Sequence, residues 1–193
     1  ENGEDFNPEV GFVRRTGGFR KYDLGINNTS RPNGFLKFQE LTPHMSFTRF
    51  WNFDGVMETS FLHLHFMGEF EDSSSTGAWY DVKSERVFRT FSISGIPVAP
   101  GRYDFSETNY SFRYNRSAPI SFGVSTTAGG LFGGDIVTVR PSVRLRYQET
   151  LNLSLSYSRN DIDLPAGSTI TNLTSARIGY NLSPRVFLQG LIQ

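Results

Sequence analysis

The chain has 193 residues, with 19 basic and 19 acidic side chains, so its formal net charge is zero. This balance excludes the broad basic surface that nucleic-acid binding requires. The sequence contains no cysteine, which excludes disulfides, cysteine-based zinc sites and a thiol nucleophile. It also lacks an apolar run of about 18 residues, the length that predicts a membrane-spanning helix.

Aromatic residues make up 15% of the chain, yet the mean hydropathy is mildly polar at −0.35. Many aromatic side chains in a chain rich in Ser, Thr, Asn and Arg are typical of strands with one apolar face and one wet face. Alternation with a period of two recurs along the chain, and Gly or Pro interrupts almost every stretch that could form a helix. We therefore expect an all-β protein.

The alternation predicts ten strands. In chain order they are expected near residues 19–30, 35–51, 56–70, 78–91, 102–115, 119–128, 135–147, 150–159, 168–182 and 185–192. The clearest pair is SVRLRYQETLNLSLSYSRND at 142–161, in which apolar and polar residues alternate on both sides of a short break. Pro43 and Pro141 fall inside expected strands, where proline removes a ladder donor and can mark a bulge.

The alternation divides the strands into two sets of side chains. The apolar set includes Leu41, Met45, Phe47, Leu62, Leu64, Phe66, Tyr110, Phe112, Phe122, Val143, Leu145, Leu153, Leu155 and Ile178. The facing set consists mostly of Ser, Thr, Asn, Gly and Arg, a mixture typical of the lumen of a membrane barrel. Aromatic residues near the ends of apolar rows predict a girdle at the membrane interfaces: Trp51, Trp79, Tyr114, Tyr147, Tyr157 and Tyr180.

The connections between the expected strands alternate between short and long from residue 71 onward. DSSSTG, NRSAP, QET and LSPR are read as short turns, and SISGIPVAPGRYD, AGGLFGGD and RNDIDLPAGS as long loops. Tight turns at one end and longer loops at the other are characteristic of outer-membrane barrels. The pattern therefore favours an antiparallel up-and-down transmembrane β-barrel over a soluble sandwich, whose core takes the same alternating residues.

Four segments resemble a known family: DFNPEVGFVRR at 5–15, SETNYSFRYNRS at 106–117, YSRNDIDLPAGS at 157–168 and SPRVFLQGLIQ at 183–193. They are similar to the C-terminal outer-membrane barrel of an uncharacterised family of bacterial envelope proteins. Members of that family carry a secretory signal and an N-terminal domain akin to carbohydrate-binding module family 9, followed by the barrel.

The resemblance covers essentially the whole of residues 1–193, which we expect to be a single β-barrel domain or a fragment of one. It implies location in the bacterial outer membrane and work as a pore or membrane anchor, with carbohydrate-related solutes as one possible cargo. The family's sugar-binding-like domain is absent from this sequence. In the family the barrel begins earlier and continues further, so the resemblance implies that these strands are part of a larger barrel.

The three histidines of the chain are His44, His63 and His65. If residues 52–55 form a tight hairpin, His44 lies opposite His63 or His65, and all three side chains share the polar face. Such a cluster could bind zinc or copper through imidazole nitrogens. We instead expect three ordinary polar residues, because the only carboxylates adjacent in this hairpin are Glu40 and Glu69.

Five arginines are expected on the same polar face, where acidic residues are few: Arg113, Arg140, Arg144, Arg146 and Arg177. They would bias a pore toward anions or bind phosphate groups, and the alternative is that they pair with acids on other strands. AGGLFGGD resembles a phosphate-binding loop, but it lacks the Gly-Lys-Ser/Thr ending, so we expect a hairpin connection there.

No catalytic constellation stands out, so we expect neither an enzyme nor a bound cofactor. The expected partners are outer-membrane lipid and lipopolysaccharide, with saccharides or other envelope proteins as further candidates and nucleic acid excluded. Two alternative functions remain open. One is a structural barrel subunit of a larger envelope assembly, and the other is a soluble β-sandwich that binds carbohydrate.

Overall fold

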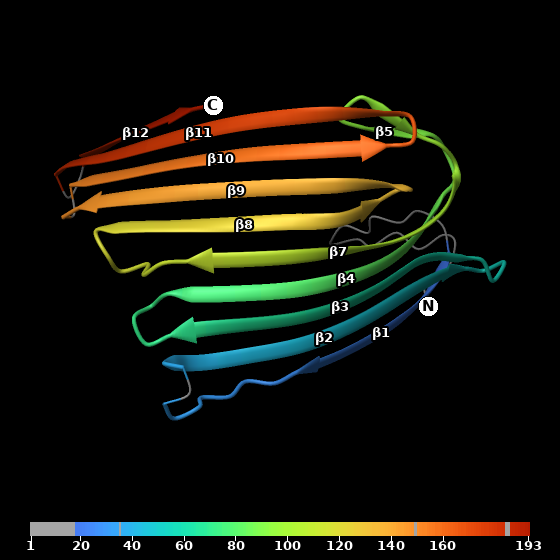
Figure 1. Ribbon diagram of the computed structural model, residues 1–193, viewed down its shortest axis with the longest axis horizontal. Coiled ribbons are helices and arrows are strands. Elements are labelled where there is room, and N and C mark those ends of the chain that lie inside the picture. The colour runs from blue at the N-terminus through green and yellow to red at the C-terminus, as the bar shows by residue number, and fades with distance from the viewer. Residues whose placement is uncertain (1–17, 35, 149, 184–185) are drawn as a thin grey trace.

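The computed structural model describes residues 18–34, 36–148, 150–183 and 186–193. These residues form twelve strands and the connections between them (Figure 1). The strands are β1 (Phe19–Asn27), β2 (Phe38–Asn52), β3 (Met57–Phe70), β4 (Ser75–Val87), β5 (Phe91–Ile93), β6 (Ile96–Val98), β7 (Gly101–Arg113), β8 (Ile120–Leu131), β9 (Gly134–Tyr147), β10 (Leu151–Leu164), β11 (Gly167–Ser183) and β12 (Val186–Ile192). Among the described residues, no helix has the length and hydrophobicity needed to cross a membrane.

Ten of the strands form one antiparallel sheet in which neighbours in the chain are neighbours in space, apart from the inserted β5–β6 hairpin. Figure 1 shows this order as a continuous series from β1 at one edge to β12 at the other. The up-and-down topology and the ten predicted strands are confirmed, and each predicted strand overlaps an observed one. The sheet is open, with β1 and β12 as its two edges.

The register assigns the side chains to two faces, because directly paired residues point to the same side of a sheet. Leu155 pairs with Val143 on one side and with Ala176 on the other, whereas Ser156 pairs with Ser142 and Ser175. The same parity holds across the sheet and confirms the two predicted sets. We call them the apolar face and the polar face.

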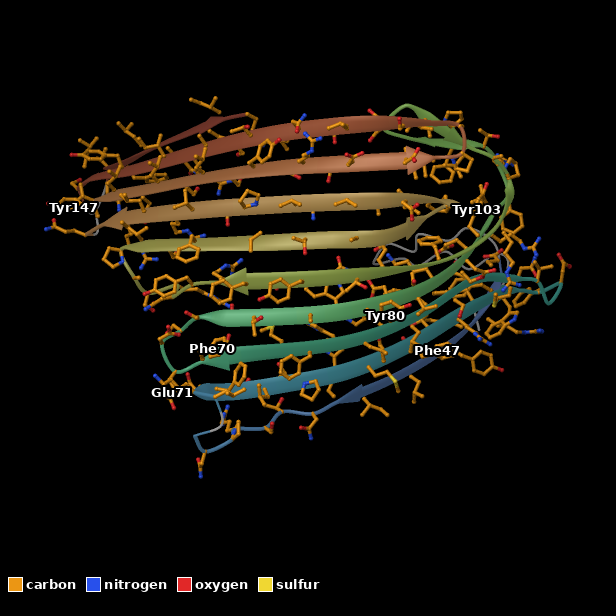
Figure 2. All side chains as sticks on the ribbon, viewed as in Figure 1. Phe47, Phe70, Glu71, Tyr80, Tyr103 and Tyr147 are labelled. Atoms are coloured by element: carbon orange, nitrogen blue, oxygen red, sulfur yellow. The ribbon has the colours of Figure 1, made fainter. Side chains whose placement is uncertain are left out.

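The apolar face is open to its surroundings. Exposed fractions are 52% for Phe122, 49% for Ile178 and 45% for Leu155, in the middle and second half of the sheet. The described residues supply no second sheet over this face, since the only other sheet is the small β5–β6 hairpin. Figure 2 shows the side chains along the strands, with Tyr147 at one end of the sheet and Tyr103 at the other.

The predicted alternation of short and long connections is wrong. AGGLFGGD and RNDIDLPAGS form strand ends joined by tight turns at residues 132–133 and 165–166. Among the expected connections from residue 71 onward, the structure shows a long one at 88–100 alone. The strands simply continue beyond their alternating cores, because paired backbones need no apolar side chain to extend a hairpin. Phe132 and Gly133 have φ angles of 45° and 85°, the positive values of a type I′ turn, so AGGLFGGD is a hairpin as expected.

The long connection contains the β5–β6 hairpin, which the sequence pattern does not predict. Ile96 and Val98 of this hairpin pack against Ile162 and Leu164 of β10, and all four are at most 7% exposed. Ile162 pairs with Ile136 of β9, and Ile136 pairs with Gly129 of β8, so these residues lie on the polar face. The hairpin therefore covers the polar face at the end of β8–β11. Figure 1 shows the connection running from β4 to the ends of β10 and β11 and back to β7.

Two smaller expectations also need correction. Trp79 pairs with His65 and Asn109, so it lies on the polar face rather than in an aromatic girdle of the apolar rows. Pro43 and Pro141 remain in register with β3 and β8, so neither marks a bulge. The irregularities of β2 fall instead between Phe38 and Glu40 and between Phe50 and Trp51.

Candidate functional site

The polar face of β2, β3, β4 and β7 carries most of the chemically reactive side chains. In β3, alternation places His63 and His65 on this face, and their partners across β4 are Asp81 and Trp79. In β7, Glu107 pairs with Asp81 and Asn109 pairs with Trp79. These groups lie on one surface because residues two apart in a strand, and residues paired directly across strands, point to the same side of the sheet.

The histidine cluster, formed by His44, His63 and His65, lies on the β2–β3 hairpin. His44 pairs directly with His65, as one of the two predicted registers required, and His63 pairs with Ser46 in the next row. The ring centroid of His44 lies 4.5 Å from that of His65 and 5.0 Å from that of His63. One ligand atom from each imidazole lies within 4.8 Å of the others, so the three rings are close neighbours on the polar face.

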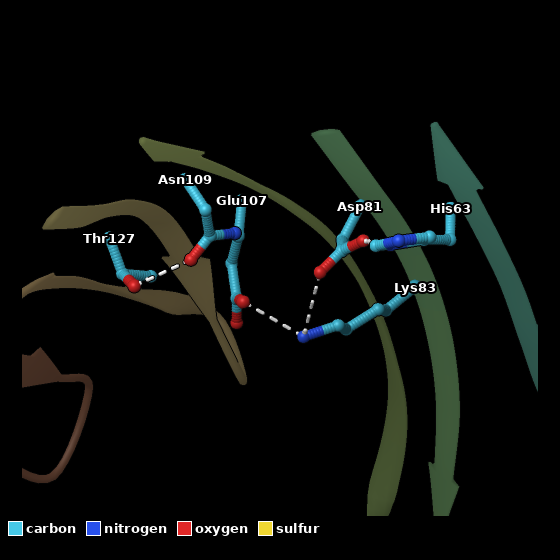
Figure 3. Close-up of polar contacts among 6 residues, drawn as sticks. All are labelled: His63, Asp81, Lys83, Glu107, Asn109 and Thr127. Carbon is cyan, nitrogen blue, oxygen red and sulfur yellow. Dashed lines mark hydrogen bonds and ion pairs between the residues drawn. The ribbon is translucent and has the colours of Figure 1, made fainter. Parts of the chain in front are cut away.

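A carboxylate–lysine network adjoins the histidine cluster (Figure 3). Asp81 Oδ1 lies 2.5 Å from His63 Nδ1, and Lys83 Nζ lies 2.8 Å from Glu107 Oε2. Lys83 also approaches Asp81 Oδ2 at 4.0 Å, which links the two pairs. Since Asp81 is 7% exposed, it needs these partners to offset the loss of hydration of its charge.

Neutral hydrogen bonds continue the polar rows toward β11. The Thr127 hydroxyl donates to Asn109 Oδ1 at 2.5 Å, a contact visible in Figure 3. On the next strands Thr138, which is 1% exposed, donates to Asn160 Oδ1 at 3.0 Å. Asn160 Nδ2 in turn donates to the Thr171 hydroxyl at 3.0 Å. These bonds stabilise the polar face without placing charge on it.

The structure places all five predicted arginines on the polar face. Arg144 and Arg177 flank Ser154 from β9 and β11, Arg140 pairs with Ser125, and Arg146 pairs with Asn152. Arg113 pairs with Gly123 of β8. All five are exposed, and none forms an ion pair with another side chain in the described part of the chain. We call these residues the arginine set.

An aromatic hollow of about 490 Å³ lies beside the carboxylate–lysine network on the polar face. Its lining combines phenylalanine rings with charged and hydroxyl groups: Thr48, Phe50, Thr59, Phe61, Lys83, Glu85, Phe105, Glu107, Leu131 and Phe132. The Lys83 ammonium lies 5.9 Å from the ring centroids of both Phe61 and Phe105. Apolar walls with a few fixed polar groups are the usual lining of small-molecule sites.

The sequence pattern predicts the histidines and arginines of this face but not the network of Asp81, Lys83 and Glu107. Glu40 and Glu69, the carboxylates expected near the histidines, instead pair with Arg31 and Arg116. Asp81 comes from β4, on the other side of β3. The available signal was the segment YDVKSE at 80–85, in which charged residues alternate with Tyr80, Val82 and Ser84.

Of the segments that resemble the bacterial envelope family, residues 5–15 lie outside the described residues. No family model matches the chain, and neither the curated proteins nor the solved structures contain a significant match.

Proposed function

We propose that the protein is an outer-membrane β-barrel of the bacterial envelope that serves as a pore or as a membrane anchor. The observation that carries this proposal is the exposed apolar face of a single-layered sheet whose opposite face is polar. Such a sheet leaves its apolar side chains unfavourably hydrated in water, whereas acyl chains solvate them and a lumen hydrates the polar face.

Closure of the sheet is part of the proposal. Both edge strands, β1 and β12, present backbone groups on one side that have no ladder partner within the sheet. In hydrocarbon each unpaired backbone group costs several kcal/mol, so a membrane sheet must close. We infer that further strands complete the barrel between these two edges.

The polar face supports a role in the binding or passage of solutes. The arginine set brings positive charge without acidic partners in the described residues, which favours anionic solutes or the phosphate groups of lipopolysaccharide. The aromatic hollow has the size and mixed lining of a site for a small solute such as a saccharide. Outer-membrane lipid and lipopolysaccharide are the proposed surroundings of the apolar face.

Two measurements on the full-length protein test this function. It should fractionate with the outer membrane and migrate differently in detergent gels before and after heating, as folded barrels do. In planar bilayers it should give a stable, ohmic conductance if the lumen is open. A protein that remains soluble without detergent and fails to migrate differently after heating would refute the membrane barrel.

A structural barrel subunit is the second candidate, and one observation favours it. The β5–β6 hairpin packs on the polar face through Ile96 and Val98, and a similar cover could close a lumen. Absence of conductance in a heat-modifiable, membrane-inserted protein would favour this candidate. A soluble β-sandwich that binds carbohydrate has less support, because it needs a second sheet over the apolar rows and the described residues provide none.

A further inference from the structure

We propose that His44, His63 and His65 form a binding site for a divalent transition-metal ion, with Zn²⁺ as the reference ion. All three histidines of the chain meet at this one place on the polar face. The proposal goes beyond the pore or anchor function and does not depend on it, since the hairpin that carries the site is complete within the described residues.

The distances are compatible with a metal after small ring rotations. Tetrahedral Zn²⁺ with bonds of about 2.0–2.1 Å holds its ligand nitrogens about 3.4 Å apart. In the cluster the ligand atoms lie within 4.8 Å of one another before any ion is bound. Histidine χ2 has a broad energy well, so turning the imidazoles can close the remaining gap without moving the β2–β3 backbone.

Asp81 gives His63 the support that metal-binding histidines usually have. Its Oδ1 atom lies 2.5 Å from His63 Nδ1, which holds the ring and leaves Nε2 as the nitrogen able to bind a metal. Asp81 is itself held in place, because it is almost fully buried and its other oxygen faces Lys83. The positioning of His63 is therefore built into the sheet before an ion arrives.

The charges around the cluster favour a cation. Asp81 and Glu107 contribute two negative charges, and the ammonium of Lys83 between them contributes one positive charge. The network thus carries a net single negative charge beside the three imidazoles, which compensates part of the charge of a dication. Arg113 belongs to the far end of β7, four residues beyond Asn109, and Arg31 and Arg116 are paired with Glu40 and Glu69.

The ligand chemistry selects the class of metal. Three imidazole nitrogens with no thiolate suit Zn²⁺, Cu²⁺, Ni²⁺ and Co²⁺, whereas Ca²⁺ and Mg²⁺ require oxygen ligands. Three protein ligands leave the fourth tetrahedral position to water or to a solute, the arrangement of an open site. Because the His63 side chain remains 20% exposed, the ion can reach the cluster from the polar face.

The test uses the untagged, folded full chain, stripped with chelator and titrated with Zn²⁺ against a competing indicator. We expect one ion per chain. His63→Gln and His65→Gln each should weaken the affinity by about 100-fold or more, and Asp81→Asn by about 10- to 100-fold. Asn152→Ala, on the same face but on β10, is the matched control and should leave the affinity unchanged.

Gln keeps the size and polarity of the replaced ring, and retained strand signal in circular dichroism with unchanged gel migration will verify that each variant folds. Cu²⁺ adds an independent readout, because imidazole ligands give nitrogen hyperfine structure in electron paramagnetic resonance. That structure should be reduced in His65→Gln. Absence of Zn²⁺ binding, or equal affinity in the wild type and both histidine variants, overturns the site. These readouts are independent of conductance, so failure here is distinguishable from failure of the pore.

Discussion

Asp81 and Glu107 lie directly opposite each other on β4 and β7, and both carboxylates share the ammonium of Lys83. Like charges in directly paired positions destabilise a sheet unless a cation lies between them. The side chains of Asp81 and Glu107 are only 9% and 12% exposed, so solvent screens their repulsion weakly. Lys83 is therefore the residue on which the stability of this part of the polar face depends.

Replacement of Lys83 by Met should lower the free energy of unfolding by about 2 kcal/mol, because two nearly buried carboxylates lose their cation. Urea unfolding in detergent measures the loss. Arg102→Met is the matched control, since Arg102 and Asp104 form an exposed pair and should contribute little. Glu107→Gln in the Lys83→Met background should recover part of the loss. Equal effects of the two Met substitutions would contradict the role assigned to Lys83.

The sequence predicted the strands well because a period of two survives in almost every one of them. A tight turn at 52–55 limits the partner of His44 to His63 or His65, and the structure shows that the partner is His65. The contact of Asp81 with His63 was not predictable, because it depends on the register between β3 and β4, and the DSSSTG connection does not define that register by itself. The carboxylate that supports His63 could therefore be identified only from the three-dimensional pairing.

The missed hairpin and the mistaken loops have a different cause. β5 and β6 have three residues each, too few for alternation to become visible. Residues 160–164 fall in the expected connection RNDIDLPAGS and include Asp161 and Asp163, yet β11 pairs with them along their whole length. Backbone pairing with β11 extends β10 through these residues, beyond the strand expected at 150–159.

Leu155→Arg should prevent stable insertion into phospholipid bilayers, whereas Ser156→Arg should be tolerated. Leu155 lies on the apolar face between Val143 and Ala176, and Ser156 lies next to it on the polar face. An arginine at the middle of a bilayer costs a membrane barrel about 2–4 kcal/mol, while a lumen hydrates the same group. The folded fraction in vesicles, measured by heat-dependent gel migration, compares the two variants. Similar folded fractions would argue against lipid at the apolar face.

The double substitution Arg144→Gln and Arg177→Gln should reduce the preference of the pore for anions. These two arginines flank Ser154 on neighbouring strands and have no acidic partner in the described part of the chain. Reversal potentials in a salt gradient measure the change, with a shift toward cation passage expected. Arg159→Gln is the control, because Arg159 lies near Asp161 on the apolar face. A wild-type pore that prefers cations would contradict this role of the arginine set.

Ile162→Ala and Ile96→Ala should each release the β5–β6 hairpin from the polar face. Ile96 and Ile162 belong to the same buried cluster, and removal of such a side chain from a packed site costs about 2–5 kcal/mol. Chymotrypsin should then cleave faster at Phe91 of β5, because the backbone at Phe91 must leave its pairing with Val98 to enter the protease, and a released hairpin opens more readily. The two substitutions should be less than additive, because each removes part of the same contact.

Pro97→Ala is the matched control for hairpin release. Pro97 lies between the buried residues Ile96 and Val98 but is itself exposed, so its loss leaves the packing intact. Cleavage at Phe91 should remain at the wild-type rate in this variant. If all three variants are cleaved at that same rate, the contact between the hairpin and β10 does not hold the long connection in place. The hairpin would then be kept on the polar face mainly by the ring of Phe91 against Phe132, whose centroids are 5.3 Å apart, and Phe132→Ala would be the substitution that releases it.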